Sequence, residues 1–228
     1  MKNVIITRLA APALVLLLLF FFLLPGNLRA GEGTHVQQPS AAAQLERLGR
    51  DASVFQTLKT GFVQEKRLAV FQNTVVLTGR IVLQKPNRVA WHVDAPVRYS
   101  VVISDSSVRQ WDEDTDRVQE ISLAKNPVLQ NVLNQLTVWF SGDYRSLLKD
   151  FDVETARQSP PAFRFSPKKT VMASKIIRDI EIEFREDRKY LRSISIHELG
   201  GDSTVITFTD TQFDVPLEER DFEVKRRV

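Results

Sequence analysis

The amino-acid sequence predicts a mainly β protein of the α+β class: an unclosed antiparallel β-barrel, or strongly curved sheet, with helices capping its opening. Apolar and polar residues alternate in a series of short segments between residues 74 and 213, as they do in half-buried strands. The connections are short, which makes consecutive strands antiparallel neighbours. Only two regions have a helical period. A large sheet with so few helices to cover it tends to curl around an interior that its own side chains do not fill.

Residues 1–30 are expected to be a signal peptide. Lys2 and Arg8 precede an apolar run over residues 9–24, and the small residue Ala30 stands at the end of the segment. The run of about 16 residues is shorter than the roughly 20 that span a bilayer. An uncleaved signal anchor is the alternative. The prediction is export to the periplasm.

The charge balance argues against a nucleic-acid partner. The chain has 31 Lys and Arg residues against 28 Asp and Glu residues, but three of the basic residues lie in residues 1–30. The rest of the chain is therefore neutral overall, without the basic footprint of a nucleic-acid-binding protein. There is no cysteine, so no disulfide stabilises the fold and no thiol is available for lipid attachment. Residues 31–228 are expected to form one domain and to be a monomer.

The first helix is predicted over residues 40–59. Its apolar side chains recur at three- and four-residue spacing, at Leu45, Leu48, Ala52, Phe55 and Leu58. Gly61 is expected to end the helix, and extended structure is expected to begin at Phe62.

Alternation then predicts the strands. Val89, Trp91 and Val93 alternate with Arg88, His92 and Asp94, so Trp91 is expected to face inward. The other predicted strands cover residues 74–84, 98–104, 108–111, 117–123, 151–155, 162–165, 176–184, 191–198 and 204–213. The sheet is interrupted over residues 126–150, where a helical period follows Asn126-Pro127 and a second short helix is predicted over residues 144–148.

No catalytic motif accompanies these elements. The sequence has no Gly-rich phosphate loop, no Gly-x-Ser-x-Gly elbow and no His-Glu-x-x-His pair. His92 and Asp94 share a strand face, and we expect two solvated side chains there in preference to a metal site. The acidic run over residues 112–116 lacks the spacing of a calcium loop and is interpreted as a turn. We therefore expect no enzyme activity, no metal and no cofactor.

Several segments resemble, in order, the LolA family of periplasmic carriers, which escort lipoproteins from the inner to the outer membrane. Phe62-Val63-Gln64 is similar to the Phe-x-Gln that follows the first helix of the family. Residues 79–91, GRIVLQKPNRVAW, resemble its Gly-x-Leu, basic-Pro and hydrophobic-x-Trp pattern. Asn126-Pro127-Val128-Leu129 and Phe222-Glu223-Val224 resemble its helical insertion and its closing segment.

The resemblance implies an unclosed barrel with a hydrophobic cavity for acyl chains. Matched by position, the lining residues would be Phe62, Val89 and Trp91 from the sheet, with Leu129, Leu133, Leu136 and Phe140 from a lid helix. The family's lid is latched by an Arg that precedes the Pro, and this chain has Lys85 there. Lysine lacks the planar fork of a guanidinium, so Arg88 is a candidate substitute for the latch.

The expected function is that of a soluble periplasmic carrier that binds acyl chains and moves lipoproteins towards the outer membrane. Its partners would be acylated cargo, an inner-membrane exporter and an outer-membrane acceptor. Two alternatives remain open. One is a carrier of another lipid or lipid-like product, and the other is a regulatory domain of the same fold that senses lipid or protein.

Overall fold

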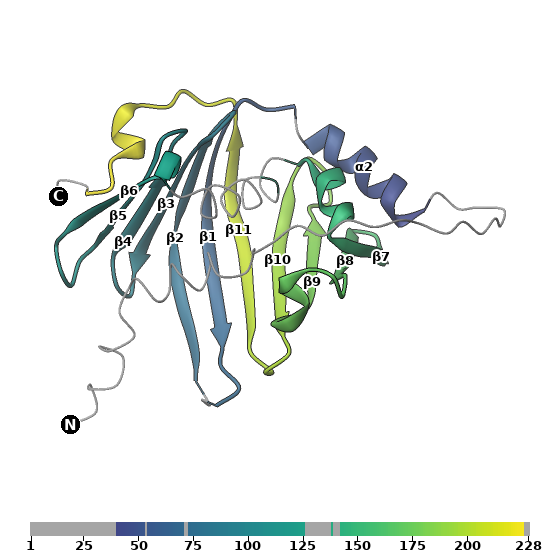
Figure 1. The fold of residues 1–228 in the computed structure, drawn as a ribbon. Helices are drawn as coiled ribbons and strands as arrows, with labels where there is room; N and C mark the ends of the chain where they lie inside the picture. Colours follow the sequence, from purple (N-terminus) through teal and green to yellow (C-terminus); the bar gives the residue numbers. More distant parts are fainter. Residues whose placement is uncertain (1–39, 53, 71–72, 126–137, 139–141, 226–228) are drawn as a thin grey trace.

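The computed structural model describes residues 40–225 except residues 53, 71–72, 126–137 and 139–141. It contains one antiparallel sheet of eleven strands (Figure 1). The strands are β1 (Thr57–Arg67), β2 (Thr74–Gln84), β3 (Arg88–Ala95), β4 (Tyr99–Ile103), β5 (Ser107–Asp112), β6 (Val118–Ser122), β7 (Phe151–Gln158), β8 (Pro161–Pro167), β9 (Ile177–Phe184), β10 (Leu191–Glu198) and β11 (Ser203–Phe213). The predicted mainly β fold is confirmed.

The strand order is β6-β5-β4-β3-β2-β1-β11-β10-β9-β8-β7. Two meanders, β1–β6 and β7–β11, are therefore joined by the pairing of β1 with β11. In that pair Phe62 lies opposite Phe208 and Gln64 opposite Ile206. β6 and β7 form the two free edges, so the sheet is not closed into a barrel.

The described helical elements are α2 (Ala41–Ala52), η2 (Leu123–Lys125), η3 (Tyr144–Lys149), η4 (Met172–Lys175) and η5 (Glu219–Phe222). Leu45 and Leu48 of α2 are buried in the main core cluster, together with Tyr144 and Leu147 of η3. Figure 1 shows α2 and η3 beside each other near the β7–β9 end of the sheet. Among the described residues, no helix is both long and apolar enough to cross a membrane.

The first helix ends earlier than the sequence predicted. α2 ends at Ala52, and Leu58 lies in β1, where it pairs with Leu83 and Phe213. Gly61 does not end a helix either, because it lies within β1. Leu58 fits both periods, and the strand period prevails because β1 pairs on both sides, with β2 and β11.

The sheet has two faces of different character. We call the face that carries Phe62, Ile81 and Trp91 the inner face, because these side chains join the cluster that includes α2. The opposite, outer face carries a smaller apolar cluster under the C-terminal segment, residues 217–224. Its members are Val82, Ala90, Val102, Trp111, Phe222 and Val224, with Leu217 packed against them.

His92 corrects the expectation of a solvated side chain. It lies on the outer face as the alternation predicted, but only 1% of it is exposed. Its Nδ1 lies 2.8 Å from Ser100 Oγ, and its Nε2 lies 3.0 Å from the backbone oxygen of Asp221 in η5. The C-terminal segment therefore covers His92 and uses it as a bridge to the sheet.

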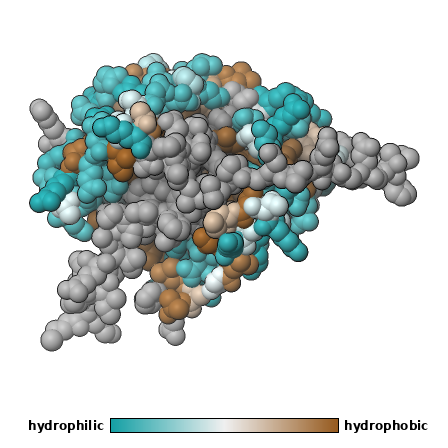
Figure 2. All heavy atoms as spheres, viewed as in Figure 1, coloured by the Kyte–Doolittle hydropathy of each residue, from teal (hydrophilic) through white to brown (hydrophobic). Residues whose placement is uncertain are grey.

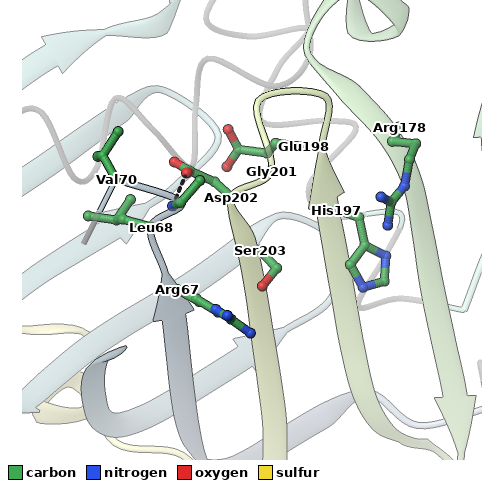
Figure 3. A pocket seen from close by; sticks show the side chains of 10 residues that line it. Arg67, Leu68, Val70, Arg178, His197, Glu198, Gly201, Asp202 and Ser203 are labelled. Carbon is green, nitrogen blue, oxygen red and sulfur yellow. Dashed lines mark hydrogen bonds between the residues drawn. The ribbon is translucent and has the colours of Figure 1, made fainter. Parts of the chain in front are cut away.

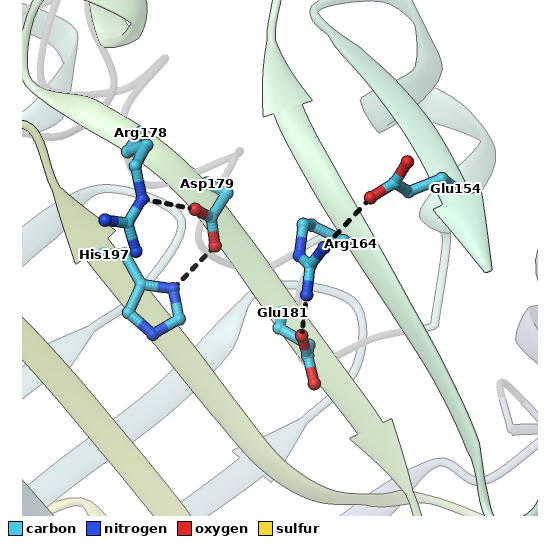
Figure 4. A network of polar contacts seen from close by, with 6 residues as sticks. All are labelled: Glu154, Arg164, Arg178, Asp179, Glu181 and His197. Carbon is cyan, nitrogen blue, oxygen red and sulfur yellow. Dashed lines mark hydrogen bonds and ion pairs between the residues drawn. The ribbon is translucent and has the colours of Figure 1, made fainter. Parts of the chain in front are cut away.

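Towards β7, the outer face carries charged ladders (Figure 4). Arg164 of β8 bridges Glu154 of β7 and Glu181 of β9, at 3.1 Å in both cases. Also in β9, Asp179 accepts hydrogen bonds from Arg178 of the same strand and from His197 of β10, at 2.8 and 2.6 Å. Burial raises the pKa of Asp179, but these hydrogen bonds outweigh it and hold the pKa below its ordinary value.

Candidate functional site: the apolar inner face

The inner face forms a continuous apolar surface from β5 to β8. Alternate residues of every strand between them point to this side, which is the period that the sequence predicted. The buried members from the sheet include Phe62, Leu77, Ile81, Leu83, Val89, Val93, Val101, Val108, Phe163, Phe165, Ile180, Ile182, Phe184, Ile194, Ile206 and Phe208. Such a surface offers an apolar ligand a large contact area.

Three residues predicted as lining lie together here. Phe62 and Val89 are buried, with 1% and 5% of their surfaces exposed. Trp91 is half-buried against the same cluster, and its ring lies 4.8 Å from that of Phe62, centroid to centroid. Trp91 therefore combines a large apolar surface with partial access, which suits a side chain that meets a ligand.

Gly79 explains why these rings fit against the sheet. A Cβ at this position would lie 2.0 Å from the backbone oxygen of His92 and 2.9 Å from Cε1 of Phe62. Any side chain would therefore displace the Phe62 ring or push β2 away from β3. The glycine in the segment that resembles the family pattern has a local packing role beside Phe62 and Trp91.

The inner face also holds polar atoms that sequence reasoning missed. Gln64 Oε1, Tyr99 Oη and Tyr144 Oη are buried and have no hydrogen-bond partner among the described residues. Lys66, also buried, pairs with Glu198 at 3.3 Å. Burial raises the pKa of Tyr99 and of Tyr144, so both hydroxyls stay neutral. The alternation along the strand could have placed Gln64 and Lys66 on the inner face, because they follow Phe62 at two-residue spacing.

The predicted lid lies mostly outside the described residues. Leu129, Leu133, Leu136 and Phe140 belong to that part of the chain, so their place as lining residues stays a prediction. Val138, from the same predicted helix, is described. It is helical and packs against the inner-face cluster.

The two latch candidates occupy different places. Lys85 lies at the edge of the inner-face cluster, with its Nζ 4.1 Å from the centroid of the Phe55 ring. Burial lowers the pKa of Lys85, although the Asp214 carboxylate acts in the opposite direction. Lys85 therefore adds a cation at the rim of the inner face.

Arg88 points to the outer face. Its guanidinium binds the Glu219 carboxylate with two bonds, of 2.8 and 2.5 Å, and stacks on Phe222 at 3.9 Å. These contacts join β3 to η5, in the C-terminal segment. Arg88, the candidate substitute for the latch, therefore makes its bidentate contact with the C-terminal segment in the described structure.

Known proteins resemble this chain over most of its length. Residues 53–225 match the family described as "Outer membrane lipoprotein carrier protein LolA". An outer-membrane lipoprotein carrier protein of Pseudomonas putida is 23% identical over 198 residues, 87% of this chain and 88% of the relative. One of Chromohalobacter salexigens is 24% identical over 149 residues, 64% of this chain and 66% of the relative.

The solved structures are more distant in sequence. An uncharacterised conserved protein of Thermus thermophilus aligns with a TM-score of 0.48 at 9% identity, over 78% of this chain and 89% of that protein. The family match covers most of the chain, from residue 53, directly after α2, through the C-terminal segment. This chain belongs to the LolA family of outer membrane lipoprotein carrier proteins.

Proposed function

We propose that this protein is a periplasmic carrier that holds acyl chains against its inner face and moves lipoproteins towards the outer membrane. The observation that carries the proposal is the continuous apolar inner face, with the half-buried Trp91 beside Phe62. The relative from Pseudomonas putida, which aligns over 88% of its length, is an outer-membrane lipoprotein carrier protein.

The energetics of such a surface suit a carrier. Each methylene removed from water contributes about 0.8 kcal/mol, so a few acyl chains bind strongly. A carrier must also release its cargo. Part of the binding energy must therefore be offset by the opening of a closed lid, for which residues 126–140 are our candidate. A protein that binds cargo only while its lid is open has two states, closed and open, and the cargo shifts their populations towards the open state.

The proposal implies an inner-membrane exporter that loads the cargo and an outer-membrane acceptor that removes it. In this scheme Phe62, Val89 and Trp91 line the acyl site from the sheet, and Lys85 lies at its rim. The signal peptide that the sequence predicts in residues 1–30 supports a periplasmic location for the carrier. The role is binding and transfer, without catalysis.

The direct experiment is native mass spectrometry of the protein purified from its own periplasm, followed by identification of the bound molecule. A bound lipoprotein, or its acylated N-terminal peptide, supports the proposal. A different lipid bound in stoichiometric amount would replace lipoprotein as the cargo. Protein that takes up no acylated molecule, even when offered a triacylated lipopeptide after delipidation, would sink the carrier role.

A matched pair of variants locates the binding surface. Trp91→Glu places a charge on the inner face and should abolish lipopeptide binding while the protein stays folded, since Trp91 is only half-buried. Val118→Glu, on the outer face of β6 with 51% of Val118 exposed, should bind as the wild type does. Equal binding by both variants would rule out the inner face as the site.

A further inference from the structure

Two hairpins meet at one end of the sheet, away from the proposed acyl site. The β1–β2 and β10–β11 connections both project from the lower end in Figure 1. They are joined there, because the backbone N–H of Ala69 donates to Asp202 Oδ1 at 2.8 Å. A Cβ on Gly201 would lie 3.2 Å from that of Ala69, so the two tips are in close contact.

These tips expose large apolar side chains. Val70 in the first tip is 84% exposed, and Leu199 in the second is 58% exposed. Figure 2 shows hydrophobic surface beside hydrophilic surface at this lower end of the molecule. Leu199 is also tied to the loop before β9, because its backbone N–H donates to the oxygen of Ile176 at 2.8 Å. Hydrogen bonds of the backbone thus fix the two tips with their apolar side chains exposed to solvent.

Hydrogen-bond donors line the outer face immediately above the tips. Arg67, Ser203, His197 and Arg178 come from the adjacent strands β1, β11, β10 and β9, and Figure 3 shows them side by side. His197 lies opposite Ser203 on one side and Asp179 on the other in the strand register. Together with the tips, these residues line a hollow of about 670 Å³.

The acidic groups around this hollow already have partners. Asp179 is bound by Arg178 and His197, and Glu198 by the buried Lys66. Asp202 accepts the bond from Ala69. Arg67, by contrast, is exposed and forms no ion pair with any residue that the structure describes. Arg67 therefore offers the hollow a guanidinium that pairs with none of the described carboxylates, beside Arg178, which binds Asp179 through its Nε but is 60% exposed.

We propose that this end of the molecule docks on a phospholipid bilayer, with the headgroup phosphates in the hollow and the side chains of Val70 and Leu199 in the acyl boundary. Exposed apolar tips flanked by cations are the usual composition of an interfacial membrane contact. Arginines near an anionic surface add electrostatic attraction that weakens as salt rises. The proposal concerns a docking surface distinct from the acyl site, so it does not depend on which cargo the inner face holds.

The test is co-sedimentation of the full-length mature protein with vesicles of phosphatidylethanolamine and phosphatidylglycerol. Arg67→Gln combined with Arg178→Gln should lower the partition coefficient by about fivefold for each guanidinium removed. Val70→Asp combined with Leu199→Asp should also release the protein, and both of these positions are exposed enough for the fold to persist. Wild-type binding should fall as salt is raised.

Matched controls sit elsewhere on the surface. Arg145→Gln removes an arginine whose side chain is 81% exposed in η3, and Val118→Asp with Ile121→Asp alters exposed apolar residues of the edge strand β6. These variants should bind vesicles as the wild type does. Wild-type protein that fails to sediment with the vesicles, or tip and arginine variants that still sediment fully, would overturn the proposal.

Two further arms separate other occupants of the same site. Trp91→Glu disables the proposed acyl site but should leave vesicle binding intact; loss of binding in this variant would mean that the inner face extracts lipid and that the tips do not dock. Inorganic phosphate at millimolar concentration should not compete, beyond its ionic strength, with the vesicles. Displacement by phosphate but not by chloride of equal ionic strength would make the hollow a site for free phosphate and would refute membrane docking.

Discussion

His92 and Asp179 show how differently two polar residues of the same sheet face are used. His92 is covered by the C-terminal segment and bridges Ser100 to the backbone of Asp221. Asp179 lies at the other half of the sheet and accepts hydrogen bonds from Arg178 and His197. Neither role follows from the alternation of residues along a strand, because alternation gives the face of a side chain but not what covers that face.

Asp179 should make the stability of the fold depend on pH. Burial raises the pKa of Asp179, but the hydrogen bonds from Arg178 and His197 outweigh it and hold the pKa below the ordinary value. A carboxyl with a lowered folded-state pKa contributes stability above its unfolded pKa of about 3.9, and that contribution is lost as the pH falls through the folded-state pKa. Asp179→Asn should therefore destabilise the protein at pH 7 but approach the wild type as the pH falls through the lowered pKa of Asp179.

Urea unfolding at several pH values measures this difference. Asp94→Asn is the matched control, because Asp94 lies on the same face in a salt bridge with Arg80 but is about half exposed. Exposed pairs contribute little, so its substitution should change the free energy of unfolding by less than about 0.5 kcal/mol. A constant difference between Asp179→Asn and the wild type across the pH range would show that charge is not the cause.

At the scale of elements, the strands were predictable, and so was the short helix over residues 144–148, found at Tyr144–Lys149, but the end of the first helix was not. Ile180, Ile182 and Phe184 alternate with acidic residues. β9 places the apolar side chains on one face of the sheet and the acidic side chains on the other, as expected. Leu58 fitted both a helical and a strand period, so α2 was predicted to extend too far. The pairing that decides between the two periods joins β1 to β11, about 150 residues away, and no local pattern contains it.

The residues of the candidate site were likewise predictable only in part. Phe62, Val89 and Trp91 could be placed on the inner face because strand period and the family resemblance agree there. The partner of Arg88 could not be foreseen, because Glu219 lies 131 residues further along the chain. Gln64 and Lys66 were also missed, since polar residues on an apolar face interrupt the very pattern used to find it.

The C-terminal segment should be a structural element that the sheet requires. Phe222 is 1% exposed, packs in the outer-face cluster and lies under the Arg88 guanidinium. Phe222→Ala leaves a cavity between η5 and the sheet, and should lower the free energy of unfolding by about 3–5 kcal/mol. Chemical denaturation followed by circular dichroism measures the change.

Val118→Ala is the control for this prediction. Val118 lies on the same outer face, opposite Trp111, but is 51% exposed. Its substitution should change the stability by less than about 0.5 kcal/mol. If Phe222→Ala had as small an effect, the C-terminal segment would be an accessory to the sheet instead of part of its core.

At the scale of the whole molecule, the two faces of the sheet have different roles. The outer face is closed by the C-terminal segment at one half and by ion pairs at the other. The inner face carries the larger apolar surface, and Val138 is the described residue through which the predicted lid meets it. Stability and cargo binding should therefore respond to different substitutions.

Ligand-induced stabilisation tests this division. A cargo that binds only the folded protein stabilises it by about 2.7 kcal/mol at 100 times its Kd, which for a protein of this size raises the Tm by roughly 5–10 °C. Leu133→Glu places a charge in the predicted lid. It should leave the Tm of the delipidated protein unchanged but abolish the increase on addition of a triacylated lipopeptide.

Asn134→Glu adds the same charge one position along the predicted helix, on its polar side, and should keep the full increase. If both variants lost the increase in Tm, the added charge alone, and not the position of Leu133, would explain the loss. A full increase in Leu133→Glu would mean that the lid helix does not contact the cargo, and the inner face would then have to bind acyl chains without it.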